Sequence, residues 1–105
     1  QDLPGQIRAQ LQRCEQTYPD AKQMASLLLL SPRTLQRQLQ KAELSYQNLI
    51  DTDRIRRSKE KLANTRLNIS VIASELNFAD TAHFCNLFKR QTNMTPTEYR
   101  KSVQS

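Results

Sequence analysis

The chain has 105 residues, 37% of them hydrophobic, which is enough for one modest core or for two very small cores that share a connector. Its 16 Lys and Arg residues outnumber its 10 Asp and Glu residues, and the resulting net charge of +6 favours a polyanionic partner. The two cysteines lie far apart and the chain has 1 histidine, so neither a zinc site nor a disulfide framework is supported, and we expect reduced thiols, no metal and no cofactor.

No stretch of the sequence reaches the roughly 18 consecutive apolar residues that a membrane-spanning helix requires. The strongest apolar run, Leu27 to Leu30, covers barely one helical turn. The first residues also lack the charged region and following apolar region of a signal peptide. We therefore expect a soluble, cytoplasmic protein with no membrane partner, and the lack of an initiator Met is compatible with a piece of a longer chain.

The first predicted element is an amphipathic helix from Leu3 to about Thr17, closed by Tyr18-Pro19. Its apolar residues recur at the three- and four-residue steps of one helix face, and they are Leu3, Ile7, Leu11 and Cys14. We interpret Cys14 as a packing residue of this face.

Two short helices follow in a helix-turn-helix arrangement over about residues 20–42. Asp20, with Gln23 three residues later, predicts a capping box at the first of them. Ser31 and Pro32 supply an N-cap and a first-position proline for the second. The residues expected to face inward are Met24, Ala25, Leu28, Leu35 and Leu39.

The stretch from Ser45 to Asn64 contains neither Gly nor Pro, and it predicts one connector helix spanning roughly 30 Å. Its apolar residues change direction along the helix. Tyr46, Leu49 and Ile50 share one side, whereas Ile55, Ser58 and Leu62 point to nearly the opposite side. This pattern indicates that one helix contributes to two cores.

The helix-turn-helix pattern recurs over about residues 70–92, where we expect Ser70 and Asp80 to be the N-caps. A shift of 48 or 49 residues aligns the two units, pairing Met24 with Ile72, Leu28 with Leu76, Ser31 with Asp80, Leu35 with Phe84 and Leu39 with Phe88. A capping box from Thr95 to Glu98 opens a last helix. We predict an all-α fold of seven helices and no strands, with two helix-turn-helix subdomains joined by a long connector helix.

The second helix of each unit has a predicted outer face of basic, amide and small side chains. These are Arg33, Gln36, Arg37, Gln40 and Lys41 in the first unit and Ala82, His83, Asn86, Lys89 and Arg90 in the second. Beyond the capping positions neither face has an acid, whereas a solvated face usually mixes charges. Arg, Asn and Gln pair with guanine and adenine edges, and a helix fits the major groove. We therefore interpret these two helix faces as DNA-reading surfaces and not as solvent-exposed surfaces without a partner.

Six segments between about Asp20 and Arg100 form a specific combined pattern. They are Ser31-Pro32-Arg33-Thr34-Leu35-Gln36-Arg37, Ile69-Ser70-Val71-Ile72-Ala73, Phe78-Ala79-Asp80, Phe84, Phe88-Lys89-Arg90 and Met94-Thr95-Pro96-Thr97-Glu98-Tyr99-Arg100. This pattern resembles the DNA-binding domain of the AraC/XylS transcription regulators. The resemblance implies a domain that binds double-stranded promoter DNA to regulate transcription, usually fused to a sensor or dimerisation domain. We expect RNA polymerase as a further partner.

By position, the resemblance implies base contacts from Arg33, Gln36 and Arg37 in the first unit and from Thr81, Ala82, His83 and Asn86 in the second. The side chains expected at phosphates are Ser31, Gln40, Lys41, Arg57, Lys61, Lys89 and Arg90. A connector of roughly 30 Å would let the two units meet successive major-groove segments about 34 Å apart.

Members of this family often carry glycine at four turns where this chain has Leu29, Glu43, Asn77 and Asn93. Left-handed backbone would cost Leu or Glu roughly 1 kcal/mol, so we expect these turns to be strained or to have a different geometry.

Two other functions remain open from the sequence. The basic helices could dock an acidic protein such as a polymerase subunit, or they could coat nucleic acid without sequence preference. An enzyme is not expected, because a catalytic His83 would need a nucleophile or carboxylate that its own helix does not supply. Cys85 is interpreted as a packing residue.

Overall fold

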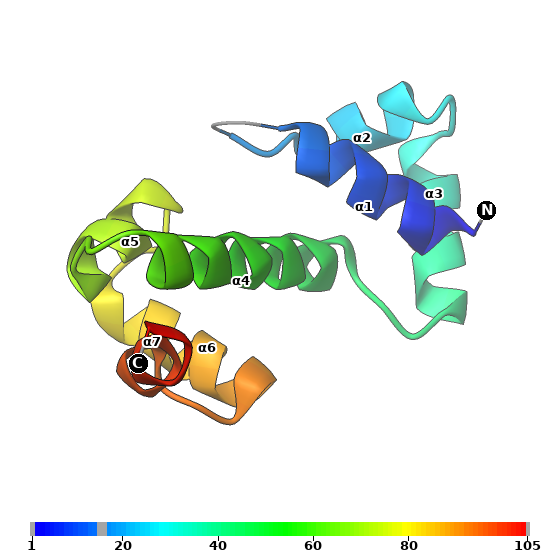
Figure 1. Cartoon of the computed structure of the whole chain (residues 1–105). Helices are drawn as coiled ribbons and strands as arrows, with labels where there is room; N and C mark the ends of the chain where they lie inside the picture. The colour runs from blue at the N-terminus through cyan, green and yellow to red at the C-terminus, as the bar shows by residue number, and fades with distance from the viewer. Residues whose placement is uncertain (1, 15–16, 105) are drawn as a thin grey trace. The chain divides into compact units, whose positions relative to one another are not determined.

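The computed structural model describes residues 2–14 and 17–104, and within these ranges the chain forms seven α-helices and no strand (Figure 1). The helices are α1 (Leu3–Arg13), α2 (Ala21–Leu27), α3 (Pro32–Lys41), α4 (Tyr46–Asn64), α5 (Ile69–Glu75), α6 (Thr81–Thr92) and α7 (Pro96–Gln104). The all-α prediction is confirmed. In the part of the chain that is described, no helix is both long and apolar enough to cross a membrane.

The chain folds as two compact units, Gln1–Asp53 and Arg54–Ser105, and the boundary between them falls inside α4. The buried core of the first unit consists of Ile7, Leu11, Met24, Ala25, Leu35, Leu39, Leu49 and Ile50. That of the second consists of Ile55, Leu62, Ile72, Ala73, Leu76, Phe78, Phe84, Leu87 and Phe88. The prediction that the connector contributes to two cores is therefore confirmed.

Side-chain caps mark the predicted starts of three helices in the middle of the chain. The Asp20 carboxylate accepts a hydrogen bond from the Gln23 amide at 2.7 Å, and the Gln23 side chain accepts one from the Asp20 amide at 3.0 Å. Ser31 caps α3 and Asp80 caps α6 through one such bond each, in which the cap side chain accepts from the Thr34 amide or the His83 amide. These bonds satisfy amides that have no partner inside the helix, so they stabilise short helices that would be marginal alone.

The last helix also begins with the predicted capping box. The Thr95 hydroxyl accepts from the Glu98 amide at 3.1 Å, and the Glu98 carboxylate accepts from the Thr95 amide at 2.8 Å. Hydrogen bonds from the Thr95 backbone and side chain hold the pKa of Glu98 below its usual value.

The predicted end of the first helix is wrong, because α1 stops at Arg13 and not near Thr17. Cys14 has an extended backbone at the C-cap, and its amide donates to the Leu11 carbonyl at 3.1 Å. The helix therefore ends with a backbone hydrogen bond between residues three positions apart, as in a 3₁₀ turn. Cys14 itself remains half-buried.

The predicted cap of α5 is also wrong, because Asn68 and not Ser70 occupies the N-cap. The Asn68 side chain accepts from the Val71 amide at 3.1 Å, and the Ser70 hydroxyl donates to the same oxygen at 3.0 Å. Asn and Ser cap helices about equally well, so local preference does not separate them. The earlier start places Ile69 against the second core.

The two helix-turn-helix units repeat each other in detail. α2 and α5 are both seven residues long and lie 48 residues apart in the chain. The turn after each ends with the same type of backbone bond, from Leu30 to the Ala25 carbonyl at 2.8 Å and from Phe78 to the Ala73 carbonyl at 3.0 Å. The second turn contains one more residue before the next helix starts, so α6 begins 49 residues after α3.

All four positions without the expected glycine keep the left-handed backbone. Their φ angles are 60° at Leu29, 59° at Glu43, 63° at Asn77 and 64° at Asn93. Asn tolerates this conformation, but Leu and Glu do so at a cost of roughly 1 kcal/mol each. The Leu29 side chain is 92% exposed, so little packing offsets its strain.

We predict that Leu29→Gly stabilises the chain by about 1 kcal/mol, because glycine adopts φ near +60° without steric penalty. For a domain of this size that gain corresponds to a rise in melting temperature of about 4–8 °C, measurable by thermal unfolding. Asn77→Gly is the matched control and should change the melting temperature less. A lower melting temperature for Leu29→Gly would show that Leu29 is not strained.

Candidate nucleic-acid interface

The outer face of α3 forms a continuous polar stripe. Arg33, Gln36, Arg37, Gln40 and Lys41 are all exposed, as predicted. Most of them are three or four positions apart and are therefore neighbours on the helix surface. Arg33, Gln36, Arg37 and Gln40 surround a shallow hollow of about 310 Å³. On the opposite side Leu35 and Leu39, 1% and 2% exposed, anchor α3 in the first core.

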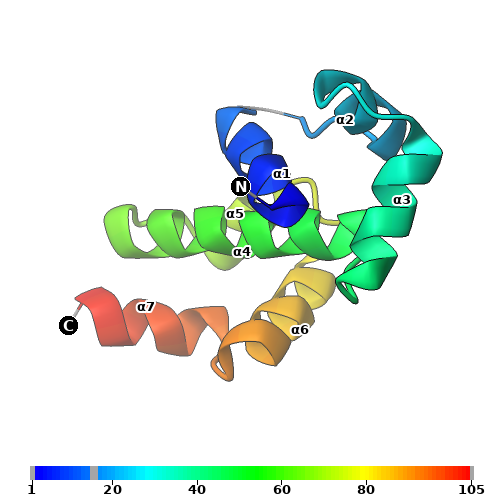
Figure 2. The same cartoon turned by 90° about the vertical axis from the view of Figure 1, so that its right-hand side faces the viewer.

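The outer face of α6 has a different character. Ala82, His83, Asn86, Lys89 and Arg90 are exposed, and Thr81 is half-buried at the first position of the helix. The His83 ring lies edge-on to Phe78, with ring centroids 5.5 Å apart. On the opposite side, Phe84, Leu87 and Phe88 are buried in the core of the second unit. Figure 2 shows α6 with the neighbouring helix α7 of this unit. The first two turns therefore present uncharged groups and an imidazole, and both basic residues lie in the last turn.

The predicted phosphate ligands of the connector are half-buried. Arg57 and Lys61 are both of intermediate exposure, and the Lys61 ammonium lies 2.9 Å from the Glu75 carboxylate of α5. This pair is partly exposed, so it contributes little to stability. The ion pair does give Lys61 an anionic partner within the chain. Because Glu75 lies 14 residues away, no local sequence pattern predicts this pairing.

Two other arginines have structural roles that no local sequence pattern predicts. The Arg54 guanidinium lies over the Phe78 ring, 4.6 Å from its centroid, and donates to the Asn77 carbonyl at 3.5 Å. Arg100 of α7 donates to the carbonyls of Leu62 and Thr65 at 3.2 and 3.3 Å. These carbonyls belong to the end of α4 and the residue after it, so Arg100 supplies hydrogen bonds and a favourable charge to a helix C-terminus.

A partly buried hydrogen bond of the first unit also has no local sequence pattern that predicts it. Asp53 is 6% exposed, and its carboxylate accepts from the Tyr18 hydroxyl at 2.6 Å. The sequence pattern indicated Tyr18 only as part of the end of the first helix. A buried carboxylate requires such a partner, so this bond ties the segment before α2 to the middle of α4.

The two cysteines are free and half-buried. Burial raises the pKa of the Cys85 thiol, which keeps it protonated near neutral pH and favours a packing role. Within residues 2–14 and 17–104, no three or more His, Cys, Asp or Glu side chains come together as they would around a metal ion.

Comparisons with known proteins agree on one family. The family model described as a helix-turn-helix domain matches residues 24–102. The chain is 34% identical over 85 residues to the ornithine utilization regulator of Pseudomonas aeruginosa, a match covering 81% of this chain and 25% of that protein. The chain thus spans about a quarter of the length of the curated relatives it matches.

Solved structures give the same result. The transcriptional regulator CdpR from Pseudomonas aeruginosa is 31% identical and superimposes with a TM-score of 0.82 over 93% of this chain and 31% of that one. A DNA-binding transcriptional dual regulator from Escherichia coli K-12 is 23% identical, with a TM-score of 0.86 over 98% of this chain and 93% of that one. Because its identity is only 23%, the Escherichia coli structure is evidence for the shared fold and for nothing more.

We predict that Glu75→Gln strengthens binding to duplex DNA about threefold at low salt, because it removes a negative charge and releases Lys61 from its 2.9 Å partner. The measurement is a titration of labelled duplex followed by fluorescence anisotropy. In a Lys61→Met background the same substitution should give a smaller gain, since coupled partners are not additive. An equal gain in both backgrounds would mean that Lys61 does not contact phosphate.

Proposed function

The chain belongs to the helix-turn-helix family of AraC-type DNA-binding domains, and we propose that it binds specific sites in double-stranded promoter DNA to regulate transcription. One observation supports this most directly. The second helix of each helix-turn-helix unit presents an exposed face without acidic residues, and its opposite face is buried in the core of its own unit. This is a family of DNA-binding domains of transcription regulators and not of enzymes, so we assign His83 to DNA and not to catalysis.

The first reading surface is assigned to α3 of the unit at about residues 20–42. Arg33 and Arg37 can each bond both acceptors of a guanine edge, and Gln36 can pair with adenine. Their exposure and spacing let them enter one major groove together. Ser31, Gln40 and Lys41 flank them and are assigned to phosphates.

The second reading surface is assigned to α6 of the unit at about residues 70–92. Asn86 is suited to adenine, and the methyl groups of Thr81 and Ala82 are suited to the methyl group of thymine. His83 can donate to a base or to a phosphate. Lys89 and Arg90 of the last turn, with Arg57 and Lys61 of α4, are assigned to the DNA backbone.

The unbroken connector α4 supports the proposal that the two surfaces read successive major-groove segments. Its 19 residues correspond to a rod of roughly 28 Å, and successive segments on one face of B-DNA are about 34 Å apart. One chain would then read two half-sites, a task for which many helix-turn-helix proteins require a dimer.

The length of the relatives supports a proposal about the whole protein. Because the matched curated relatives are about four times as long as the aligned domain, we propose that this domain is fused to a sensor or dimerisation domain outside these 105 residues. A regulator of transcription works beside chromosomal DNA and RNA polymerase, so we assign the protein to the cytoplasm and polymerase to its partners.

The electrostatic part of the proposal predicts steep salt dependence. If about six phosphates are neutralised, the slope of log K against log salt should be about −5. Anisotropy titrations of one duplex at several salt concentrations give this slope. A slope near zero, or binding to an acidic protein that survives nuclease treatment, would instead favour a protein-docking module. Equal competition by unrelated DNA would indicate non-specific binding.

Base reading predicts that Arg37 and Asn86 control different half-sites. They occupy corresponding positions of α3 and α6, 49 residues apart. Arg37→Ala should weaken binding by roughly 1–3 kcal/mol and relax base preference in one half-site, and Asn86→Ala should do the same in the other. Selection from random duplexes with wild type and both variants measures this.

The double variant is the control for independence, because distant sites should combine additively within a few tenths of a kcal/mol. If both single variants relax the same base pairs, or if affinity falls evenly with the selected motif unchanged, Arg37 and Asn86 are not the two base readers.

A further inference from the structure

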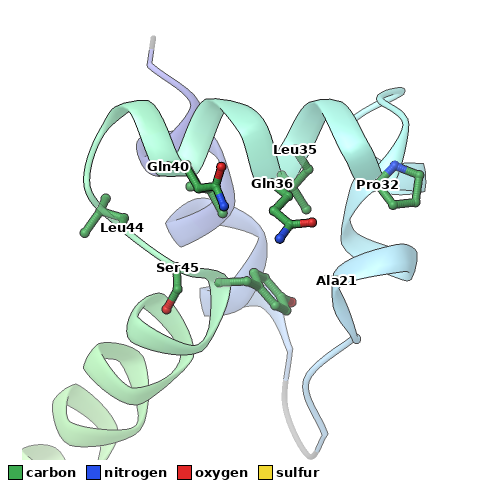
Figure 3. Close-up of a pocket in the computed structure, with 9 residues that line it drawn as sticks. Ala21, Pro32, Leu35, Gln36, Gln40, Leu44 and Ser45 are labelled. Carbon is green, nitrogen blue, oxygen red and sulfur yellow. The ribbon is translucent and has the colours of Figure 1, made fainter.

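A second hollow lies beneath the polar stripe of α3 in the first unit. It has a volume of about 390 Å³ and is bounded by α3, the first residue of α2 and the start of α4. We call it the α3–α4 pocket, and its main lining residues are Leu35, Gln36, Leu39 and Gln40 of α3 and Tyr46 of α4. Figure 3 shows Gln36 and Gln40 projecting from α3 towards the space above Ser45. The volume is within the range of small-molecule sites.

The α3–α4 pocket has no charged lining residue, although charged residues make up 25% of the chain. Leu35 and Leu39, which are almost wholly buried, form an apolar floor together with Leu44 and the Tyr46 ring. The polar side-chain groups are the amides of Gln36 and Gln40 and the hydroxyls of Ser45 and Tyr46. Such a lining disfavours ions, which would lose their hydration without gaining a counter-charge, and it favours a neutral apolar body with a few hydrogen-bonding groups.

Tyr46 adds to the neutral character of the pocket. Its hydroxyl donates to the Pro19 carbonyl at 2.6 Å, so the phenol is held in place by the segment before α2. Burial, more than the nearby Cys14 and Asp20, raises the pKa of Tyr46 to about 12. The phenol is uncharged at neutral pH, and its raised pKa keeps it uncharged in moderately alkaline buffer as well.

The α3–α4 pocket shares two residues with the proposed DNA-reading surface. Gln36 and Gln40 line this pocket, and with Arg33 and Arg37 they also line the outer hollow of α3. Each amide can point to one side or the other, since both residues are exposed and neither side chain is held by a hydrogen bond to another described residue. A molecule bound in the pocket can hold both amides away from DNA.

We propose that the α3–α4 pocket binds a small neutral molecule, largely apolar with one or two hydrogen-bonding groups, and that its binding weakens DNA recognition by α3. The coupling rests on the proposed function, because it requires Gln36 and Gln40 to contact DNA. By linkage, the molecule and DNA reduce each other's affinity by the same factor.

Indole is the probe for the site, because it is a neutral bicyclic ring with one N–H donor. In ¹H–¹⁵N spectra of the full chain without DNA, it should give saturable shifts at Leu35, Gln36, Gln40 and Tyr46, with a Kd of about 1 mM or below. Indole-3-acetate, which carries a negative charge, should bind at least about fivefold more weakly. Shifts that do not saturate, or that spread evenly over the chain, would overturn the site.

Ala21→Leu tests the location, because Ala21 lines the pocket at the exposed start of α2 and a larger side chain there fills the space. This variant should weaken indole binding at least about fivefold. Ala9→Leu, the same change on the exposed surface of α1, is the matched control and should leave it unaltered. Equal effects of the two variants would place indole elsewhere.

The coupling is tested with a duplex chosen by random-site selection. Saturating indole should lower DNA affinity about threefold or more for wild type and for Ala9→Leu, but not for Ala21→Leu. If indole binds without any change in DNA affinity, the proposed coupling is wrong, although the pocket is still a binding site. If the chain selects no sequence at all, the proposed function fails, while the DNA-free titration still decides whether the pocket binds neutral ligands.

Discussion

The structure depends on the shared burial of α4. A helix of seven residues is marginal in water by itself, and both α2 and α5 have this length. Each is stable only against a core, and α4 contributes Leu49 and Ile50 to one core and Ile55 and Leu62 to the other. Buried Ser58 fits this role, because its hydroxyl donates to the Ile55 carbonyl at 2.7 Å and is therefore itself paired. Two cores of eight or nine buried residues could hardly persist as separate small domains without a common helix.

The repeat shows how one backbone arrangement is obtained with different side chains. Asp20 and Asn68 cap the first helices of the two units, and Leu29 and Asn77 take the left-handed position in their turns. The backbone bonds that close these turns are equivalent, so the geometry is set by hydrogen bonding more than by residue preference. The turn at Leu29 orients α3 so that Leu35 and Leu39 are buried. The free energy gained by burying these two side chains offsets the backbone strain at Leu29.

The two outer faces differ in the way they can interact with DNA. On α3 the positive charges are distributed along the whole helix, whereas on α6 they are confined to the last turn, behind uncharged side chains. The remaining basic residues are not equivalent to these. Arg54 packs on Phe78, Arg100 completes the end of α4 and Lys61 pairs with Glu75, so part of the positive charge of the chain serves the fold. Net charge alone therefore overstates the number of phosphate contacts.

Sequence alone determined the features that depend on residues a few positions apart. The caps at Asp20, Ser31 and Asp80 follow from spacings of three residues, and the buried and exposed faces follow from the helical period. Where two local choices were nearly equal in energy, as for Asn68 and Ser70, only packing of Ile69 decided between them. The bonds of Tyr18 to Asp53 and of Arg100 to the Leu62 carbonyl, and the α3–α4 pocket, came from the tertiary structure. These features join residues tens of positions apart, and their energies depend on distances that no local pattern contains.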